Sequence, residues 1–202
     1  MPSFGDTHEP TTPISGETDL PDAFRETYAY WDGLRGATWA SPWSSFRLED
    51  LPPAILPWSV VVDIETDPPN FRYRFWGTER ANLIGKELTG LRATDIPQAD
   101  MRHGNIREYE EVCIRMEALL CQTPITTNTG RHAFCQSIRL PIRDDDENIS
   151  HIYSAIDYTQ ISTAHYEIFG TTPDSRVPDP LVGEEFLWLH RETPLKRARF
   201  SD

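Results

Sequence analysis

Histidine and cysteine are the side chains from which this sequence could build a metal or haem site, and their spacing argues against one. His132 and Cys135 form the only close pair of potential ligands. Two ligands do not make a zinc site, and on a strand a separation of three residues would point them to opposite faces. His103 has the ring that ligates haem iron, although a lone histidine near a helix start is more often a surface or capping residue. We expect no metal site and keep haem binding through His103 as one alternative.

No spacing of nucleophiles, acids and bases in the sequence is typical of an enzyme. Asp63 and Glu65 would share one face of a strand, as acid–base chemistry requires, but a solvent-exposed face explains them more simply. The run from Gly77 to Lys86 ends in Gly-Lys, yet seven residues precede that pair where a phosphate loop has four, and Glu87 replaces the Ser or Thr. The motifs GxSxG, HExxH and GxGxxG are absent. We therefore predict no catalytic residues.

The charge of the chain excludes two classes of partner. Its 202 residues carry 32 acidic and 19 basic side chains, a formal net charge of −13. Nucleic acid and anionic membranes would be repelled.

The three cysteines form no CxxC pair, and no signal peptide or apolar run of about 18 residues occurs. We expect a cytoplasmic protein that binds neither nucleic acid nor membranes.

The stretch FRYRFW, residues 71–76, predicts a strand with two different faces. Period-two alternation places three aromatic residues on one face and two arginines with a tryptophan on the other: Phe71, Tyr73 and Phe75 against Arg72, Arg74 and Trp76. Gly77 then breaks the strand, and a short helix ends at Gly85. Tyr73 is the residue of interest, because a buried hydroxyl needs a partner that a ligand or a protein group could supply.

The elements around this strand suggest one domain with tails. Residues 1–20 read as a disordered lead, and residues 163–202 as a largely irregular extension, because both ends are rich in proline and poor in clustered apolar residues. Residues 21–40 hold an amphipathic helix with an aromatic stripe, and residues 41–162 form the domain. The stripe must be covered, and its residues are Phe24, Tyr28 and Trp31.

Alternation and helical periodicity predict the rest of the domain. A strand over residues 58–65 pairs with the FRYRFW strand as a hairpin. Asn105 and Glu108 stand at capping-box spacing before the longest amphipathic helix, whose apolar stripe includes Tyr109 and Met116. Three β-like runs follow, over about 120–127, 132–142 and 150–159, the last two joined by an acidic loop that belongs in solvent.

The order of these elements resembles a PAS domain. Several short sequence motifs make the resemblance more specific, to a single-domain PAS family of bacterial proteins. In that family a tryptophan, a Leu-Arg pair, a proline-rich segment and a glycine-containing block recur in the same order. The words that carry the resemblance here are Trp31, the pair Leu34 and Arg35, then LEDLPPAILPWSVVVDIE, FRYRFWGT and GKELTG. These matching motifs are closely spaced from Trp31 to Gly90. The last three predicted strands match the family only in their strand pattern and not in specific residues.

The resemblance implies an α+β fold: a five-stranded antiparallel sheet with helices on one face, to which this chain adds its N-terminal amphipathic helix and extended tails. It implies a sensory or interaction module, without an output domain of its own, that binds an unidentified small molecule or a signalling protein. It brings no catalytic residues and no cofactor. We expect the pocket to be lined by Tyr73, Phe75, Tyr109 and Met116.

A partner surface is expected on the other side of the same strand. If Tyr73 faces the core, Trp76 faces outward with Arg72 and Arg74, and needs cover from the N-terminal helix or from a second subunit. We therefore predict a homodimer through that helix, with the interface formed by Phe24, Tyr28, Trp31, Arg72, Arg74 and Trp76. A second hypothesis is a small-molecule enzyme on a cone-like or hotdog-like α+β fold, which would require His132, Asp157 or Glu65 to converge in a pocket.

Overall fold

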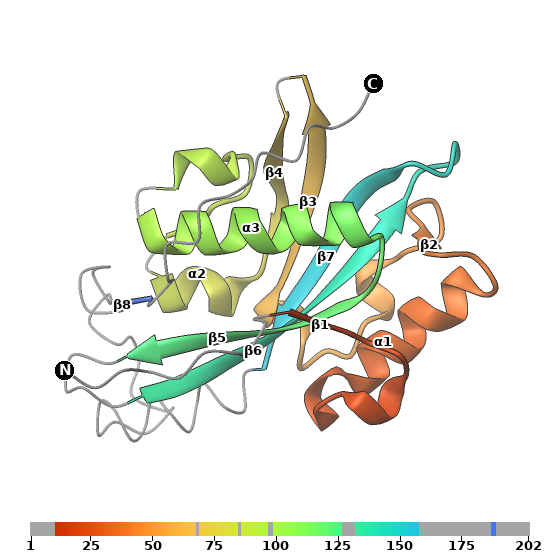
Figure 1. Ribbon diagram of the computed structural model, residues 1–202, viewed down its shortest axis with the longest axis horizontal. Coiled ribbons are helices and arrows are strands. Elements are labelled where there is room, and N and C mark those ends of the chain that lie inside the picture. The colour runs from red at the N-terminus through yellow and green to blue at the C-terminus, as the bar shows by residue number, and fades with distance from the viewer. Residues whose placement is uncertain are drawn as a thin grey trace.

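A computed structural model gives the fold of the chain, whose centre is one antiparallel sheet (Figure 1). It describes residues 11–67, 69–84, 86–96, 99–126, 132–157 and 187–188. The five long strands are adjacent in the order β5, β6, β7, β3, β4, and every neighbouring pair is antiparallel. Their bounds are β3 Ser59–Thr66, β4 Pro69–Trp76, β5 Leu119–Thr126, β6 His132–Arg143 and β7 Ile149–Ile156. The predicted α+β, PAS-like fold is confirmed.

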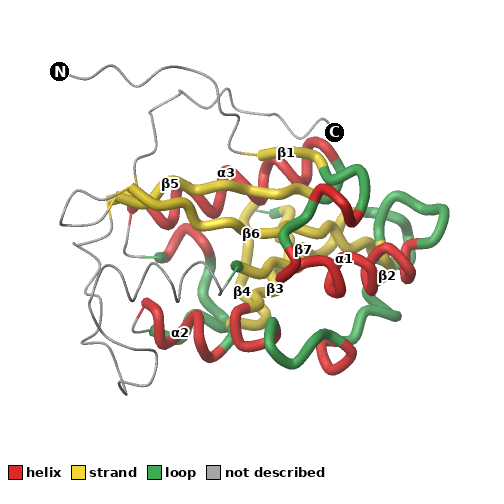
Figure 2. Tube along the Cα trace, turned by 90° about the horizontal axis from the view of Figure 1, so that it is seen from below, coloured by secondary structure: helices red, strands yellow, loops and turns green. Residues whose placement is uncertain are grey.

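Helices lie on both faces of this sheet. The short helix α2 (Thr78–Ile84) and the long helix α3 (Ala99–Arg115) lie on one face, and α1 (Asp22–Arg35) covers the other. Helix α1 contacts β2 and β6, and α3 contacts β6 and β7 (Figure 2). Turns of 3-10 helix connect these elements, at Glu17–Asp19, Leu48–Asp50, Leu56–Trp58 and Ala93–Asp95. No helix in the part of the chain that the structure describes is long and apolar enough to span a membrane.

The sheet separates two hydrophobic clusters, because successive residues of a strand point to opposite faces. Along β3, Val61 belongs to the cluster under α1, whereas Val60 and Val62 belong to the cluster under α3. The aromatic stripe of α1 is fully covered by the first cluster: Phe24, Tyr28 and Trp31 are at most 3% exposed. The α1 prediction is therefore confirmed as a helix, and its apolar face packs on its own sheet.

The predicted faces of the FRYRFW strand are wrong after Tyr73. The register between β3 and β4 pairs Val62 with Tyr73 and Val61 with Phe75, so Arg74 is an extra residue in a β-bulge. Phe75 and Trp76, which follow the bulge, therefore lie on the faces opposite to those that strict alternation predicts. Phe75 therefore packs on the α1 cluster, and Trp76, expected outside with the arginines, is 2% exposed in the cluster under α3.

Three further expectations need correction. Residues 11–20 are not an irregular lead, because β1 (Thr11–Pro13) adds antiparallel to β5 and Leu20 is buried. The long helix begins at Ala99, so Asn105 and Glu108 lie within it and cap nothing. Met116 follows its last residue with a φ of 55° and is 40% exposed, so it faces away from the interior.

Two short strands complete the sheet. Strand β2 (Ser41–Pro42) is parallel to the end of β6. Strand β8 (Leu187–Trp188) pairs with Ile125 and Thr126 of β5. The remainder of the predicted extension over residues 163–202, and residues 1–10 of the predicted lead, lie outside the described residues.

Candidate functional site

A row of side chains across the α3 face of the sheet contains the most unusual chemistry of the molecule. Directly paired residues of neighbouring strands lie side by side on the same face. The register pairs Trp76 with Val60, Val60 with Ser154, and Ser154 with Arg139. Four adjacent strands thus contribute a cross-strand row of an indole, an isopropyl group, a hydroxyl and a guanidinium. All four residues are at most 3% exposed.

Arg139 is neutralised by a buried carboxylate from α3. Its Nε donates to Oε2 of Glu108 at 2.9 Å, and its Nη2 makes a second bond to the same oxygen. The two side chains are 4% and 7% exposed. Burial, the largest single influence, would lower the pKa of Arg139, but the charge and hydrogen bond of Glu108 together with Tyr109 and Cys121 outweigh it and hold that pKa above its usual value. The guanidinium is therefore a permanent charge inside the domain.

Tyr73 is held beneath the same helix by Asn105. The Asn105 amide donates to the Tyr73 hydroxyl at 3.2 Å. Tyr73 is fully buried, and burial raises the pKa of its hydroxyl well above the usual value. The hydroxyl therefore stays protonated, with a buried partner on α3. This pair ties the middle of β4 to the centre of α3.

Tyr109 lies over the arginine at one end of the row. The guanidinium carbon of Arg139 is 5.1 Å from the centre of the Tyr109 ring, a cation–π contact. Burial raises the pKa of Tyr109, and the nearby Arg139 opposes this only partly. The Tyr73 hydroxyl is near enough to lower this pKa slightly, but the Tyr109 hydroxyl has no hydrogen bond of standard geometry among the described residues.

Trp76 forms the other end of the row. Its ring meets that of Tyr73 edge-on at 4.9 Å, and the guanidinium carbon of Arg80 lies 4.8 Å from its centre. Its indole Nε1 is buried without a hydrogen-bond partner within the described part of the chain. The same holds for the Ser154 hydroxyl and for Nη1 of Arg139. We call Trp76, Ser154, Arg139 and Tyr109 the donor row, because each presents a hydrogen that can be donated.

The donor row is suited to binding and not to bond cleavage. Cys121 is the nearby thiol, but burial raises its pKa well above the usual value, so it is not a thiolate. Within the described part of the chain, the Ser154 hydroxyl is not hydrogen-bonded to a base that could remove its proton. Buried donors that stay protonated can instead donate a hydrogen bond to an acceptor group.

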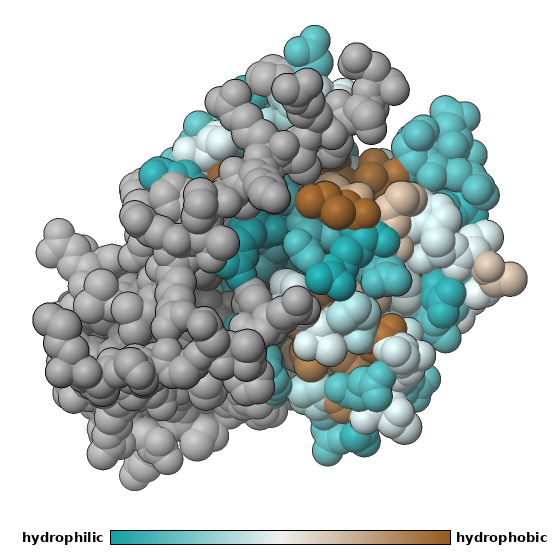
Figure 3. Space-filling model, viewed as in Figure 1, coloured by the Kyte–Doolittle hydropathy of each residue, from teal (hydrophilic) through white to brown (hydrophobic). Residues whose placement is uncertain are grey.

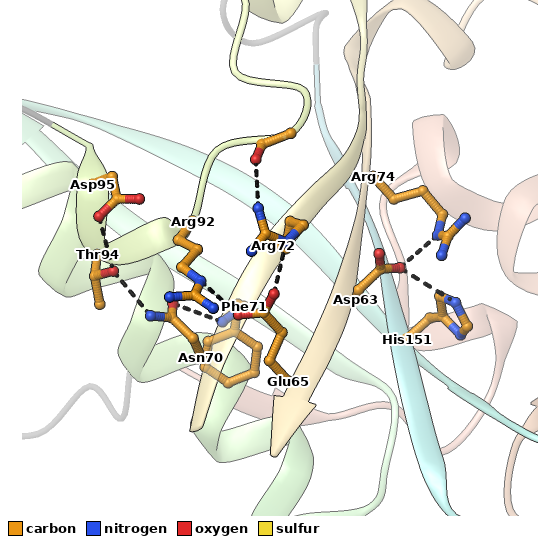
Figure 4. A network of polar contacts seen from close by, with 11 residues as sticks. Asp63, Glu65, Asn70, Phe71, Arg72, Arg74, Arg92, Thr94, Asp95 and His151 are labelled. Atoms are coloured by element: carbon orange, nitrogen blue, oxygen red, sulfur yellow. Dashed lines mark hydrogen bonds and ion pairs between the residues drawn. The ribbon is translucent and has the colours of Figure 1, made fainter. Parts of the chain in front are cut away.

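A second polar cluster lies on the surface, on the edge strand β4 and its neighbours β3 and β7 (Figure 4). Asp63 accepts from Arg74 at 2.5 Å and lies 3.3 Å from Nε2 of His151. Glu65 pairs with Arg72 at 2.6 Å and Arg92 at 2.7 Å. The two predicted interface arginines are therefore engaged in ion pairs within the chain. These ion pairs fix the edge of the sheet.

Trp43 stacks on the imidazole of this surface cluster. The ring centres of Trp43 and His151 are 4.0 Å apart, and the guanidinium carbon of Arg74 lies 5.6 Å from the Trp43 ring. Ser150 shares a hydrogen bond of 2.8 Å with Nδ1 of His151. Burial lowers the pKa of His151, which favours the neutral ring. The neutral ring can donate from Nε2 to Asp63 while Nδ1 accepts from Ser150.

The four predicted pocket residues do not lie together in the structure. Tyr73 and Tyr109 are brought together under α3, whereas Phe75 lies on the other side of the sheet and Met116 is exposed. Their role as ligand contacts stays a prediction.

The predicted interface residues also separate. The α1 aromatics are buried in their own chain, and Trp76 belongs to the donor row. Arg72 and Arg74 remain at the surface as half-exposed members of ion pairs. A dimer through α1 would have to use side chains other than its aromatic stripe.

The convergence that an enzyme would need is not found for Glu65 and Asp157. Asp157 follows the end of β7 that pairs with Ser59, whereas Glu65 lies near the opposite end of β3. Six residues of strand span about 20 Å. The side chains of His132 and His103 lie outside the described residues. Among the side chains that are described, no group of three His, Cys, Asp or Glu residues could hold a metal ion.

Sequence reasoning missed most of the donor row. Arg139 interrupts the apolar run SIRLPI, and a charge at an inward strand position is a signal of a buried partner that could have been read. The spacing of Asn105 and Glu108 predicts a capping box, whereas in the structure both side chains are buried inside α3. Nothing in the sequence around Ser154 indicates that this residue lies beside Arg139. Only the strand register shows that it lies beside Arg139.

Comparison with known proteins adds limited information. Neither a protein-family model nor a curated protein matches the chain. The PAS domain of the histidine kinase ThkA is 16% identical, and the match covers 49% of this chain and 97% of that domain with a TM-score of 0.36. An RNA-binding light-oxygen-voltage receptor is 8% identical over 79% of this chain and 41% of its own, with a TM-score of 0.40.

A third similar structure is VqmA of Vibrio cholera in a complex with ligand and DNA. It is 12% identical, and the match covers 67% of this chain and 62% of that protein with a TM-score of 0.38. This chain spans less than two thirds of VqmA and of the light-oxygen-voltage receptor. Because these overlaps are partial, the PAS-like fold rests on the strand order and the helix positions of the chain itself.

Proposed function

We propose that this chain is a PAS-type sensory module that binds a small molecule at the donor row, between the sheet and α3, and passes the signal to a partner protein. One observation carries the proposal. Four buried polar atoms of the donor row have no hydrogen-bond partner among the described residues. Buried polar groups in native proteins are almost always satisfied by protein, water or ligand.

The energetic cost of leaving these atoms unpaired is large. Each unsatisfied buried group costs about 1–3 kcal/mol, so four cost on the order of 4–12 kcal/mol. A whole domain is stable by only about 5–15 kcal/mol. The folded chain therefore needs an occupant at this site, and the occupants available are ordered water and a ligand. A sensory role requires the ligand.

Helix α3 offers a route from the site to a partner. It contributes Asn105, Glu108 and Tyr109 to the site, and its last turn presents Ile114, which is 61% exposed. Met116 follows it, and the space-filling view shows a hydrophobic area near the end of α3 (Figure 3). A ligand that shifts α3 would move this apolar end, which supports contact with a signalling protein there.

Mass spectrometry under native conditions tests the proposal directly. Protein purified from its own host should show a mass above that of the chain, and the excess should disappear on denaturation. Tyr109→Phe removes one donor-row hydroxyl without changing the ring, and should lower the retained fraction. Thr27→Val is the matched control, because it removes a buried hydroxyl on the α1 face. A native mass equal to that of the chain, with thermal stability unaffected by a metabolite extract, would show that water fills the site.

A further inference from the structure

A buried histidine and a half-exposed arginine share one carboxylate oxygen in the surface cluster of Figure 4. Nε of Arg74 donates to Oδ1 of Asp63 at 2.5 Å, and Nε2 of His151 lies 3.3 Å from the same oxygen. The strands β4, β3 and β7, which are neighbours in the sheet, bring these three side chains together. While the imidazole is neutral, the three groups carry one positive and one negative charge, and the site is balanced.

Protonation of His151 upsets this balance. A cationic imidazole and the Arg74 guanidinium then compete for one oxygen of Asp63, and the two cations repel each other. The Arg74 side chain is 49% exposed and the His151 side chain is 11% exposed. Water can replace the carboxylate around an exposed guanidinium, whereas a cation with little access to water depends on its counter-charge. Asp63 therefore stays with His151, and Arg74 is the group that leaves.

The stacking of Trp43 on His151 favours the same outcome. Their ring centres are 4.0 Å apart and the ring planes are within 14° of parallel, whereas the guanidinium carbon of Arg74 is 5.6 Å from the Trp43 ring. A protonated imidazole in this position makes a closer cation–π contact than Arg74 does, so Trp43 keeps a cation on its ring. Ser150 fits both states, because its hydroxyl can donate to a neutral Nδ1 and accept from a protonated one.

We propose that His151 is a pH-controlled switch whose protonation releases Arg74 from Asp63 to the surface of the edge strand β4. The cluster then gains one positive charge, and the free guanidinium becomes available to an acidic group of a partner protein. Burial is the main cause that lowers the pKa of His151, and Arg74 also lowers it, while Asp63 and Asp144 oppose them. The switch therefore operates at mildly acidic pH. It requires no ligand at the donor row, so it goes beyond the proposed function.

Nuclear magnetic resonance of the full isotope-labelled chain, from about pH 7.5 to about pH 4.5, tests the switch. The Nε–H signal of Arg74, identified by its absence from Arg74→Gln, reports the ion pair because the pair protects this proton from exchange with water. This signal should weaken or move with the same midpoint as the His151 ring. Arg74→Gln should raise that midpoint, because the coupling between two groups is reciprocal. Arg72→Gln is the matched control and should leave it unchanged, because Arg72 lies on the same strand but pairs with Glu65.

Several results would overturn the switch. An Arg74 signal that stays unchanged while His151 titrates would show that Arg74 keeps its partner. A His151 midpoint in Arg74→Gln that is equal to or below that of the natural chain would show that the two cations do not compete. A ring that stays neutral over the whole range would show that mild acidity does not operate the switch. Asp63→Asn should abolish the change in the Arg74 signal, and a change of the original size would exclude Asp63 as the shared partner. Circular dichroism of each variant confirms that it is folded.

Discussion

Replacing Glu108 by glutamine should destabilise the protein by about 3–5 kcal/mol, because it leaves a buried charge without its counter-charge. The side chains of Glu108 and Arg139 are 7% and 4% exposed, so solvent cannot replace the lost carboxylate. Glutamine keeps the size of the side chain and one acceptor oxygen, which confines the change to the charge. A loss of this size is a large part of the stability of a domain.

Urea unfolding followed by tryptophan fluorescence at pH 7 measures this loss. Glu111→Gln is the matched control, because Glu111 lies one turn further along α3 and pairs with Arg115 where both side chains are about one third exposed. Such a surface pair contributes about 0–1 kcal/mol. The double replacement of Glu108 and Arg139 by glutamine and methionine should recover much of the stability. A loss below about 1 kcal/mol for Glu108→Gln alone would refute the buried-pair reasoning.

Two further predictions follow from other parts of the molecule. Gly77→Ala should destabilise the protein by about 2 kcal/mol or more, because the added Cβ would lie 2.2 Å from the carbonyl oxygen of Pro57. Gly33→Ala in α1 should stabilise it by up to about 1 kcal/mol, because the added Cβ meets no atom within 4 Å. If the urea midpoints of the two variants move equally, this reasoning is wrong. Burial lowers the pKa of His151, so the unfolded chain binds more protons as the pH falls from 7 toward 5 and stability declines over that window. His151→Gln should flatten this decline, and equal unfolding free energies for the two proteins at each pH would show that His151 is not its cause.

The sheet and its helices were predictable because their signals are local and repeated. The β-branched run before the FRYRFW strand and the acidic turn between β6 and β7 predicted β3 and β6 within one residue of their observed bounds, and the start of β7 within one residue, although β7 ends three residues earlier than predicted. Gly36, which takes a φ of 55°, correctly marked the end of α1. Such signals depend on neighbours in sequence, so they survive without knowledge of the tertiary structure.

The site was not predictable in the same way, because its residues meet only through strand register and helix depth. Asn105 and Glu108 have the spacing of a capping box, and only the start of α3 at Ala99 shows that they lie inside the helix. Their real partners are Tyr73, 32 residues earlier, and Arg139, 31 residues later. Hydrophobic periodicity in the sequence cannot reveal contacts between residues that are about 30 positions apart.

One extra residue in β4 connects these observations. Without the bulge at Arg74, strict alternation from Tyr73 would place Trp76 on the α1 face and Phe75 under α3. With it, Phe75 fills the hydrophobic cluster below α1, while the Trp76 indole pairs across Val60 toward Ser154 and Arg139. Bulges often re-aim side chains beside functional sites. Here the bulge replaces an apolar ring with a hydrogen-bond donor at the end of the row, as the proposed ligand site requires.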